Sequence, residues 1–313
     1  ALAARWQFRR GDAYVVHDDK VQMIDQSTGR LTPDRRWEYG LQQLVEIASG
    51  VPPSPEGRTV AQLTQQTYFR QYRLLSGLSG TARECRPEFW SIYKLQVRAI
   101  LPHAPMRLIN MGLAVFRTRA AKWDHVAARA IALAKDRAVL VGLNDVTETE
   151  ALAAVFAALG REIAVLDALA EAEEAALVSE AGHVGRITIA THLAGRGTDI
   201  ALADSVRAAG GLHVIIGSAM TSARLERQFF GRAGRSGDPG SYERAISLED
   251  RTLLEGAQSL ARGALRMLLR LPLAAVHPWA LGVFQTARDR KARRLRRVTL
   301  LREQDLVRQV GYR

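Results

Sequence analysis

The sequence predicts an α/β protein that is built on a parallel sheet and ends in a helical tail. Three observations lead to this fold class. Between residues 121 and 230, short apolar runs alternate with helix-like segments, which is the pattern of βαβ units. A glycine-rich loop at 195–197 directly follows one apolar run, at the position where parallel sheets bind ligands. From Asp250 onward the chain reads as mostly helical.

The composition is that of an ordinary globular protein. Of 313 residues, 47% are hydrophobic and 24% are charged, which excludes a disordered or collagen-like chain. The one cysteine, Cys85, can form no intrachain disulfide. The apolar stretch 271–284 is shorter than the ~20 residues that a membrane-spanning helix needs. Because the chain begins with Ala1 rather than Met, we expect it to be part of a longer protein.

The net charge of +12 comes mainly from arginine, since five of the 44 basic residues are lysine and 39 are arginine. This balance suits an anionic partner such as nucleic acid, acidic lipid or nucleotide phosphate. The alternative is a bias toward arginine codons, with most arginine side chains on solvated faces, and we favour this interpretation for most of the 39 arginines. We therefore interpret as functional only those arginines whose spacing fits a specific task. The seven histidines show no metal-ligand spacing, so no metal site is predicted in this chain.

The N-terminal third combines a hairpin with two helices and a proline-rich break. In chain order, we expect a hairpin at 14–25, a helix at 41–47 that stops at Gly50, a break at 52–55, a helix at 59–74 and a small-residue turn at 74–82. The proline-rich break predicts a domain boundary.

The central part supplies the parallel sheet. The expected helices cover 121–135, 147–159, 171–181 and 222–230, and the expected strands cover 138–142, 163–166, 187–190 and 211–216. The tail that follows carries the basic run 288–297, most of which we expect to be a solvated helix face.

The first segment with chemical content is 187–200, which reads ITIATHLAGRGTDI. Its strand leads into Gly195-Arg196-Gly197, and glycines let a backbone approach a phosphate or ribose closely. Asp199 then has two alternative roles: it accepts a hydrogen bond from a ribose hydroxyl, or it holds a neighbouring arginine. By itself the loop could also be an ordinary turn.

The second segment is 228–240, QFFGRAGRSGDPG. Arg232 and Arg235 are three residues apart, so on a helix both guanidinium groups would project to one side. Arginine suits a terminal phosphate because its planar group is permanently charged and donates two hydrogen bonds at once. Such arginines stabilise the charge that develops when a phosphoryl group leaves. The alternative is a pair of surface arginines at a helix end.

Taken together and in this order, the two segments resemble motifs five and six of the SecA preprotein translocase ATPases, a family of superfamily-two, helicase-like motors. Ordinary RNA helicases of that superfamily have a shorter A-R-G-x-D and a different motif six. Further similarity to the family lies in Asp25, 28–30, Pro33, 35–37 with Trp37, 40–41, Gly77, 80–82 and the ISLED segment 246–250. The resemblance covers most of residues 12–255.

The resemblance implies a RecA-like fold and a role for each matching residue. In the family, two RecA-like folds enclose one ATP, and the second fold supplies an arginine finger. By motif position, the resemblance implies that Arg235 is the finger and Arg232 its companion, and that Asp238 binds the nucleotide. It implies that Gly197 and Asp199 line the cleft between the folds. Gly80 and Thr81 match the motif that couples the two folds.

The resemblance also implies a domain division. Residues 1–53 correspond to the end of the preprotein-binding domain, 54–110 to the last piece of the first nucleotide-binding fold, 111–250 to the second fold and 251–313 to a helical scaffold-like tail. We therefore expect the C-terminal part of a short, divergent SecA-like protein, in which the first fold is incomplete.

The function implied is that of a protein-translocation motor. The complete protein would hydrolyse ATP with Mg²⁺, whose ligands are expected outside this chain, and would act on unfolded preproteins with a SecYEG-type channel. It would be cytoplasmic and peripherally attached to the inner face of the bacterial plasma membrane. Nucleic acid is not an expected partner, whereas acidic phospholipid and a homodimer stay open.

The departures from the family pattern keep two alternatives open. No G-x-x-x-x-G-K-[ST] and no acidic pair for magnesium occur, so we expect this chain alone to lack ATPase activity. Gln26, Phe230 and the T-H-L at 191–193 also differ from the family. A helicase C-terminal module, suggested by the net charge, and a non-catalytic SecA-like remnant are the alternative functions.

Overall fold

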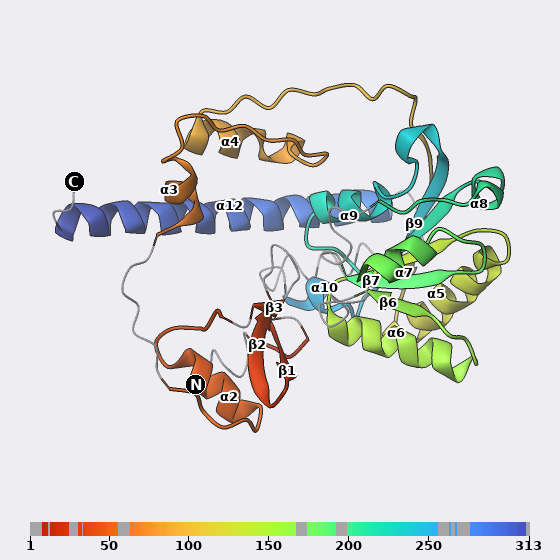
Figure 1. Ribbon diagram of the computed structural model, residues 1–313, viewed down its shortest axis with the longest axis horizontal. Helices are drawn as coiled ribbons and strands as arrows, with labels where there is room; N and C mark the ends of the chain where they lie inside the picture. The colour runs from red at the N-terminus through yellow and green to blue at the C-terminus, as the bar shows by residue number, and fades with distance from the viewer. Residues whose placement is uncertain are drawn as a thin grey trace.

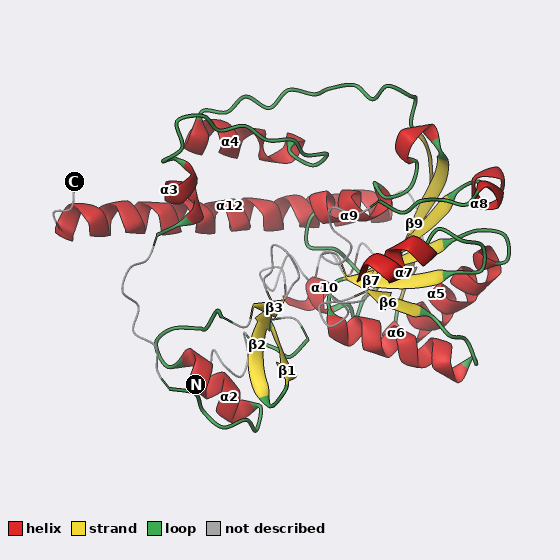
Figure 2. Cartoon of the chain, in the orientation of Figure 1, coloured by secondary structure: helices red, strands yellow, loops and turns green. Residues whose placement is uncertain are grey.

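The fold consists of two sheets and a long C-terminal helix (Figure 1). The computed structural model describes residues 8–11, 13–24, 31, 32, 34–55, 63–166, 174–191, 199–255, 263, 267 and 276–310. A small antiparallel sheet lies near the N-terminus, and a six-stranded parallel sheet with helices forms the centre (Figure 2). The expected α/β class with a helical tail is therefore confirmed.

The small sheet confirms the predicted hairpin. β1 (Tyr14–His17) pairs antiparallel with β2 (Lys20–Ile24), which pairs with β3 (Leu31–Thr32). Asp18 and Asp19 both have positive φ, 52° and 53°, as the tight primed turn of a hairpin requires. α2 (Leu41–Ala48) packs Val45 against this sheet and ends before Gly50, as expected.

The helix expected over 59–74 is wrong for residues 63, 64 and 70–74. α3 covers only Gln65–Phe69, and residues 56–62 lie outside the described part. A short helix persists only where packing supports it, and Leu74 is 90% exposed. After the turn near Thr81 the chain forms η1 (Arg83–Cys85) and α4 (Arg86–Tyr93), which the apolar pattern did not indicate.

All pairings in the central sheet are parallel, in the order β4-β9-β8-β5-β7-β6. The strands are β4 (Arg107–Phe116), β5 (Val139–Leu143), β6 (Ala164–Leu166), β7 (Ile187–Thr191), β8 (Leu212–Ile216) and β9 (Pro239–Ser247). β4 and β9 were not predicted, because Asn110 and Gly112 interrupt the apolar run of one and Glu243 and Arg244 interrupt that of the other. The sheet also begins at Arg107, inside the segment that the sequence assigned to the preceding domain.

Helices cover both faces of this sheet (Figure 1). They are α5 (Arg119–Ala134), α6 (Val146–Ala158), α7 (Glu174–Glu180), α8 (Asp204–Ala208) and α9 (Ala223–Phe230), followed by α10 (Arg251–Glu255). One buried cluster joins α5 and α6 to Val139 and Val141, and a second joins α7, α8 and α9 to Leu140. This alternation along β5 is expected of a strand that is buried on both sides.

Residues with local capping chemistry set the starts of these helices. The side chains of Thr118, Asp145 and Ser222 accept hydrogen bonds from main-chain N–H groups at the starts of α5, α6 and α9. All three helices were expected from the sequence within two or three residues of these starts.

α12 (Val276–Val310) is a single helix of 35 residues, about 52 Å long at 1.5 Å per residue. Its first turns pack Ala280, Leu281 and Phe284 against Ile246 and Leu253. It then continues past α9 and along α4 and α3 (Figure 1). In the described residues, no helix is both long and apolar enough to cross a bilayer.

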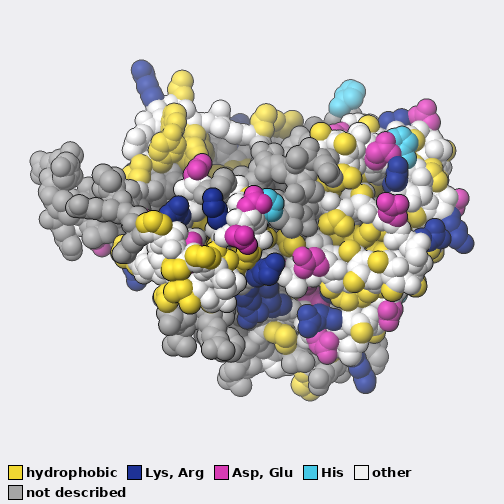
Figure 3. Space-filling view, turned by 60° about the horizontal axis from the view of Figure 1, so that its bottom comes forward, with side chains coloured by type: hydrophobic (Ala, Val, Ile, Leu, Met, Phe, Trp, Pro, Cys, Tyr) yellow, Lys and Arg dark blue, Asp and Glu magenta, His cyan; other side chains and the backbone are white. Residues whose placement is uncertain are grey.

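Charged side chains of both signs are interspersed over one face of the molecule, with a gathering of Lys and Arg near its lower centre (Figure 3). Many arginines elsewhere pair with carboxylates, including Arg129 with Glu243 and Arg186 with Glu180. These arginines are therefore engaged in ion pairs within the protein.

Candidate functional site

The second motif forms a tight turn, which we call the arginine turn (residues 231–238). α9 ends at Phe230, so Arg232 and Arg235 do not lie on a helix, contrary to the geometry expected from their spacing. Gly234 has φ 69° and directly precedes η2 (Arg235–Gly237). Since a left-handed residue cannot continue an α-helix, the glycines redirect the chain here.

The arginine turn is packed tightly onto the amino ends of two strands. A Cβ atom on Gly240 would lie 2.6 Å from the main-chain nitrogen of Gly234. One on Gly211, just before β8, would lie 1.7 Å from the carbonyl oxygen of Pro239. Glycine is therefore required at both positions by close backbone approach, and this fixes the turn relative to the sheet.

Within this frame the structure brings Arg235 and Asp199 together. Arg235 Nη1 lies 2.8 Å from Asp199 Oδ1, and Arg235 Nε donates to the carbonyl oxygen of Gly231 at 2.8 Å. The side chains are 42% and 65% exposed, so the pair lies at the surface. Of the two roles weighed for Asp199, the observed contact is the one with a neighbouring arginine.

Asp238 is held by a residue that the sequence did not single out. Arg207 on α8 donates through Nε to Asp238 Oδ2 at 3.3 Å and through Nη1 to Asp204 Oδ1 at 2.7 Å. These contacts raise the pKa of Arg207, first through the hydrogen bond with Asp238. The spacing of Asp204 and Arg207, three residues apart, could have predicted their ion pair from the sequence. Nothing in the sequence indicated that Arg207 also contacts Asp238.

The remaining expected site residues are distributed differently. Arg232 lies half-buried on the arginine turn. Thr81 is buried and bonds to Ser79, with 3.3 Å between the hydroxyl oxygens, while Gly80 is exposed. Within the described chain, Thr81 makes no hydrogen bond or ion pair with Arg235. Gly197 lies outside the described residues, as does the 25–30 segment of the family resemblance.

The Thr81 segment nevertheless contacts the helix that leads into the arginine turn. Glu84 forms an ion pair with Arg227 of α9, and its carbonyl oxygen accepts a hydrogen bond from Arg293 of α12. Burial, the largest single influence, raises the pKa of Glu84, but the hydrogen bond from Arg227, a main-chain hydrogen bond and the charges of Arg227 and Arg83 together lower it below its ordinary value. The three elements thus meet at one residue, Glu84, through its carboxylate and its main-chain carbonyl, and sequence reasoning missed this residue.

A buried ion pair lies at the opposite, carboxyl edge of the sheet. Lys122 Nζ is 2.6 Å from Asp250 Oδ1, and both side chains are 0% exposed. Asp250 Oδ2 also accepts from the main-chain nitrogens of Ser247 and Ala219. The Asp of the ISLED segment therefore joins the ends of β8 and β9 to α5, which is a structural role.

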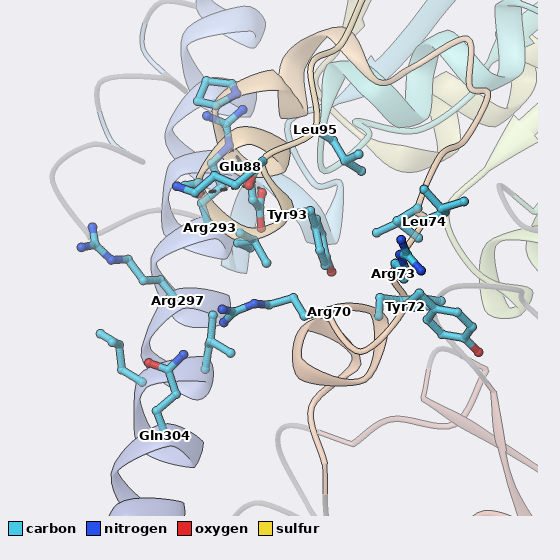
Figure 4. A pocket seen from close by; sticks show the side chains of 18 residues that line it. Arg70, Tyr72, Arg73, Leu74, Glu88, Tyr93, Leu95, Arg293, Arg297 and Gln304 are labelled. Atoms are coloured by element: carbon cyan, nitrogen blue, oxygen red, sulfur yellow. Dashed lines mark hydrogen bonds and ion pairs between the residues drawn. The ribbon is translucent and has the colours of Figure 1, made fainter. Parts of the chain in front are cut away.

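A cavity of about 900 Å³ lies away from these residues, between α12, α4 and the chain that follows α3 (Figure 4). Its wall includes Arg70, Tyr72, Tyr93, Arg293 and Arg297. None of the residues expected at the nucleotide site lines this cavity. A search for cavities would therefore not have identified the arginine turn. Among the described residues, no group of three His, Cys, Asp or Glu side chains could hold a metal ion.

Comparison with known proteins gives two matches to family models. The model of the SecA P-loop domain matches residues 105–207 and 201–268, which together are more than half of the chain. The model of the SecA preprotein cross-linking domain matches residues 1–46.

Individual relatives agree with these matches. Protein translocase subunit SecA 2 of Magnetococcus marinus is 43% identical over 284 residues, which are 90% of this chain and 43% of the relative. SecA 2 of Nitrosospira multiformis is 37% identical over 327 residues, with 100% and 47% covered. SecA of Lawsonia intracellularis is 42% identical over 251 residues, with 80% and 30% covered. The chain spans about half the length of the curated relatives it matches, or less.

Among solved structures, the E. coli DEAD-box protein SrmB bound to RraA matches at TM-score 0.39 and 18% identity, over 47% of this chain and 82% of that chain. The family models, the relatives and the two glycine-arginine motifs on one parallel sheet agree with one another. The chain therefore belongs to the SecA family.

Proposed function

We propose that this chain supplies the arginine-finger half of the ATP site in a SecA-type motor that moves preproteins across a membrane. Arg235 acts as the finger, with Arg232 beside it on the same turn. The observation that carries the proposal is the pairing of Arg235 with a surface carboxylate and a main-chain carbonyl. Both partners are oxygen acceptors, so a phosphate can replace them on the same guanidinium group.

The residues of the arginine turn suit the phosphate end of a nucleotide. Close glycine contacts fix the turn to the sheet. The backbone that carries the Arg235 guanidinium is therefore already positioned before a nucleotide binds. ATP would supply the phosphoanhydride whose cleavage drives movement. Arg235 would bind the terminal phosphate and stabilise charge there, while Asp238 would contact the nucleotide from the end of the turn. Mg²⁺ ligands and the phosphate-binding lysine would come from outside this chain.

The other assignments follow from the same proposal. The 1–53, 54–110, 111–250 and 251–313 segments act as the end of the preprotein-binding domain, the last piece of the first nucleotide fold, the second fold and the scaffold tail. An unfolded preprotein and a SecYEG-type channel are the partners, at the cytoplasmic face of the plasma membrane. The match of residues 1–46 to a preprotein cross-linking domain supports the preprotein as substrate.

The test is Arg235→Lys in the full-length translocase. Loss of an arginine finger lowers turnover by about 10³-fold or more, whereas ATP binding should be retained because other residues hold the nucleotide. Steady-state ATPase and a fluorescent-nucleotide titration measure the two quantities. Arg186→Lys, in an exposed pair on the same domain, is the matched control and should keep full turnover.

Retained turnover in the Arg235→Lys protein contradicts the assignment of the finger. ATPase that is stimulated by single-stranded RNA, with steep salt dependence, and not by a preprotein would favour the helicase alternative instead.

A further inference from the structure

The arginine turn carries two ion pairs, and each joins a residue of the proposed nucleotide site to a partner on another segment. Arg235 pairs with Asp199, which lies 36 residues earlier in the chain. Asp238 pairs with Arg207, 31 residues earlier. The cation and the anion that would face a nucleotide are thus both occupied by opposite charges from the protein itself.

Asp199 is held in place for this contact. Its Oδ1 accepts a hydrogen bond from the main-chain nitrogen of Ile200 at 3.1 Å, in addition to the one from Arg235 Nη1 at 2.8 Å. Ile200 is itself buried in the cluster beneath α8 and α9. The carboxylate is therefore anchored to the core through the next residue, although its own side chain is exposed.

A carboxylate at this distance occupies the direction from which a phosphate oxygen would approach Arg235. The guanidinium donates through Nη1 to Asp199 and through Nε to Gly231, so two donor groups are already engaged. A phosphate that binds with the same donors must take the place of Asp199, because two anions cannot share them without repulsion.

We propose that Asp199 is a positioning residue that holds Arg235 in a resting orientation, and that an incoming polyphosphate displaces it. The inference rests on the proposed function, since it assumes that Arg235 binds phosphate. In this role Asp199 sets how readily Arg235 leaves its ion pair to bind phosphate, and it does not contact the ribose.

The experiment is isothermal titration calorimetry of the 313-residue chain with inorganic tripolyphosphate, which has no ribose or base. Asp199→Asn removes the competing charge and should tighten binding by about two- to fivefold, the range expected for an exposed ion pair. Arg235→Ala should weaken binding. In the Arg235→Ala background, Asp199→Asn should have no further effect, since a double-mutant cycle isolates their coupling.

Asp204→Asn is the matched control. It changes the net charge by the same amount close to the same turn, but Asp204 contacts Arg207 rather than Arg235. If Asp204→Asn tightens binding as much as Asp199→Asn, the effect comes from overall charge and the inference is wrong. It is equally wrong if Asp199→Asn leaves binding unchanged or weakens it. If Arg235→Ala has no effect at all, it is the proposed function that fails.

Discussion

Two regions of this molecule are held in place by different kinds of contact. The parallel sheet, residues 107–247, is covered on both faces by buried apolar clusters. The segment 63–95 lies along α12 and is held largely by charged and polar contacts, while Tyr72, Leu74 and Trp90 stay about half exposed or more. The difference teaches that the site-bearing sheet is stable through its own core, whereas the segment depends on partners.

The polar contacts of this segment follow one another along α12. Arg293 donates to the carbonyl oxygen of Glu84, and Arg296 donates from two nitrogens to Glu88 at 2.6 and 2.8 Å. Further along, Glu303 accepts hydrogen bonds from the main-chain nitrogen of Thr64, the N-cap of α3, and from the hydroxyl of Thr67. These contacts also use part of the basic run 288–297, which is therefore not simply a solvated face.

The largest expected effect lies in the sheet. Asp250→Ala leaves the fully buried Lys122 ammonium without its carboxylate, and removing one partner of a buried pair costs about 3–5 kcal/mol of unfolding free energy. Urea unfolding followed by circular dichroism measures this loss. Glu150→Ala, at an exposed position of α6, is the control and should change stability by less than about 0.5 kcal/mol. A small effect of Asp250→Ala would mean that the buried pair is not what joins α5 to β8 and β9.

Acidification should destabilise the segment 63–95 more than the parallel sheet. The pKa values of Glu84 and Glu303 are lowered, although burial opposes this. Hydrogen bonds together outweigh burial at Glu303, and hydrogen bonds together with nearby arginine charges outweigh it at Glu84. Their contribution is therefore present above the ordinary value of 4.5 and is lost as the pH falls through the lower values of the folded protein. Burial raises the pKa of Glu148 on α6, which packs on the sheet, so protonation there favours the folded state.

The measurement is limited digestion with pepsin over this acid range. Cleavage within 63–95 should increase relative to cleavage within the sheet as the pH falls below 4.5. The double variant Glu84→Gln with Glu303→Gln should be cleaved readily at both ends of the range. Equal acid sensitivity of the two regions would remove the distinction drawn between them.

The smallest expected effect is that of a single ion pair. Glu84→Gln removes the charge that joins the Thr81 segment to Arg227 of α9. Because the pair is partly exposed, we expect docking of the segment to weaken by only about two- to fivefold. Maleimide modification of Cys85, the one cysteine of the chain, reports this docking as a rate at neutral pH.

Salt provides an independent check of the same contact. Raising ionic strength from about 0.1 M to about 1 M shortens the screening distance from ~10 to ~3 Å and should speed Cys85 modification in the native chain. The Glu84→Gln chain should respond less. Glu180→Gln, in an exposed pair remote in sequence, should behave like the native chain. A rate that is indifferent to both salt and Glu84→Gln would show that apolar packing holds the segment.

Much of the fold could be predicted from the sequence, because local patterns carried it. The hairpin was visible in its two β-rich runs around Asp18 and Asp19, and four strands of the sheet were visible as apolar runs. β4 and β9 were missed because polar residues interrupt their apolar patterns, and because their pairing with each other and with β8 is not visible in the sequence. The helix expected over 59–74 extends no further than Phe69, and Leu74 beyond it is 90% exposed.

The candidate site divides in the same way. The sequence by itself determined the family and the arginine turn, since glycines at fixed spacing and two arginines between them are properties of the chain order. Only the tertiary structure decided which partners those side chains have, as with Asp199 for Arg235, Arg207 for Asp238 and Arg227 for Glu84. Ion pairs depend on distances of a few ångströms between segments far apart in the chain, and the packing of helices on the sheet sets those distances.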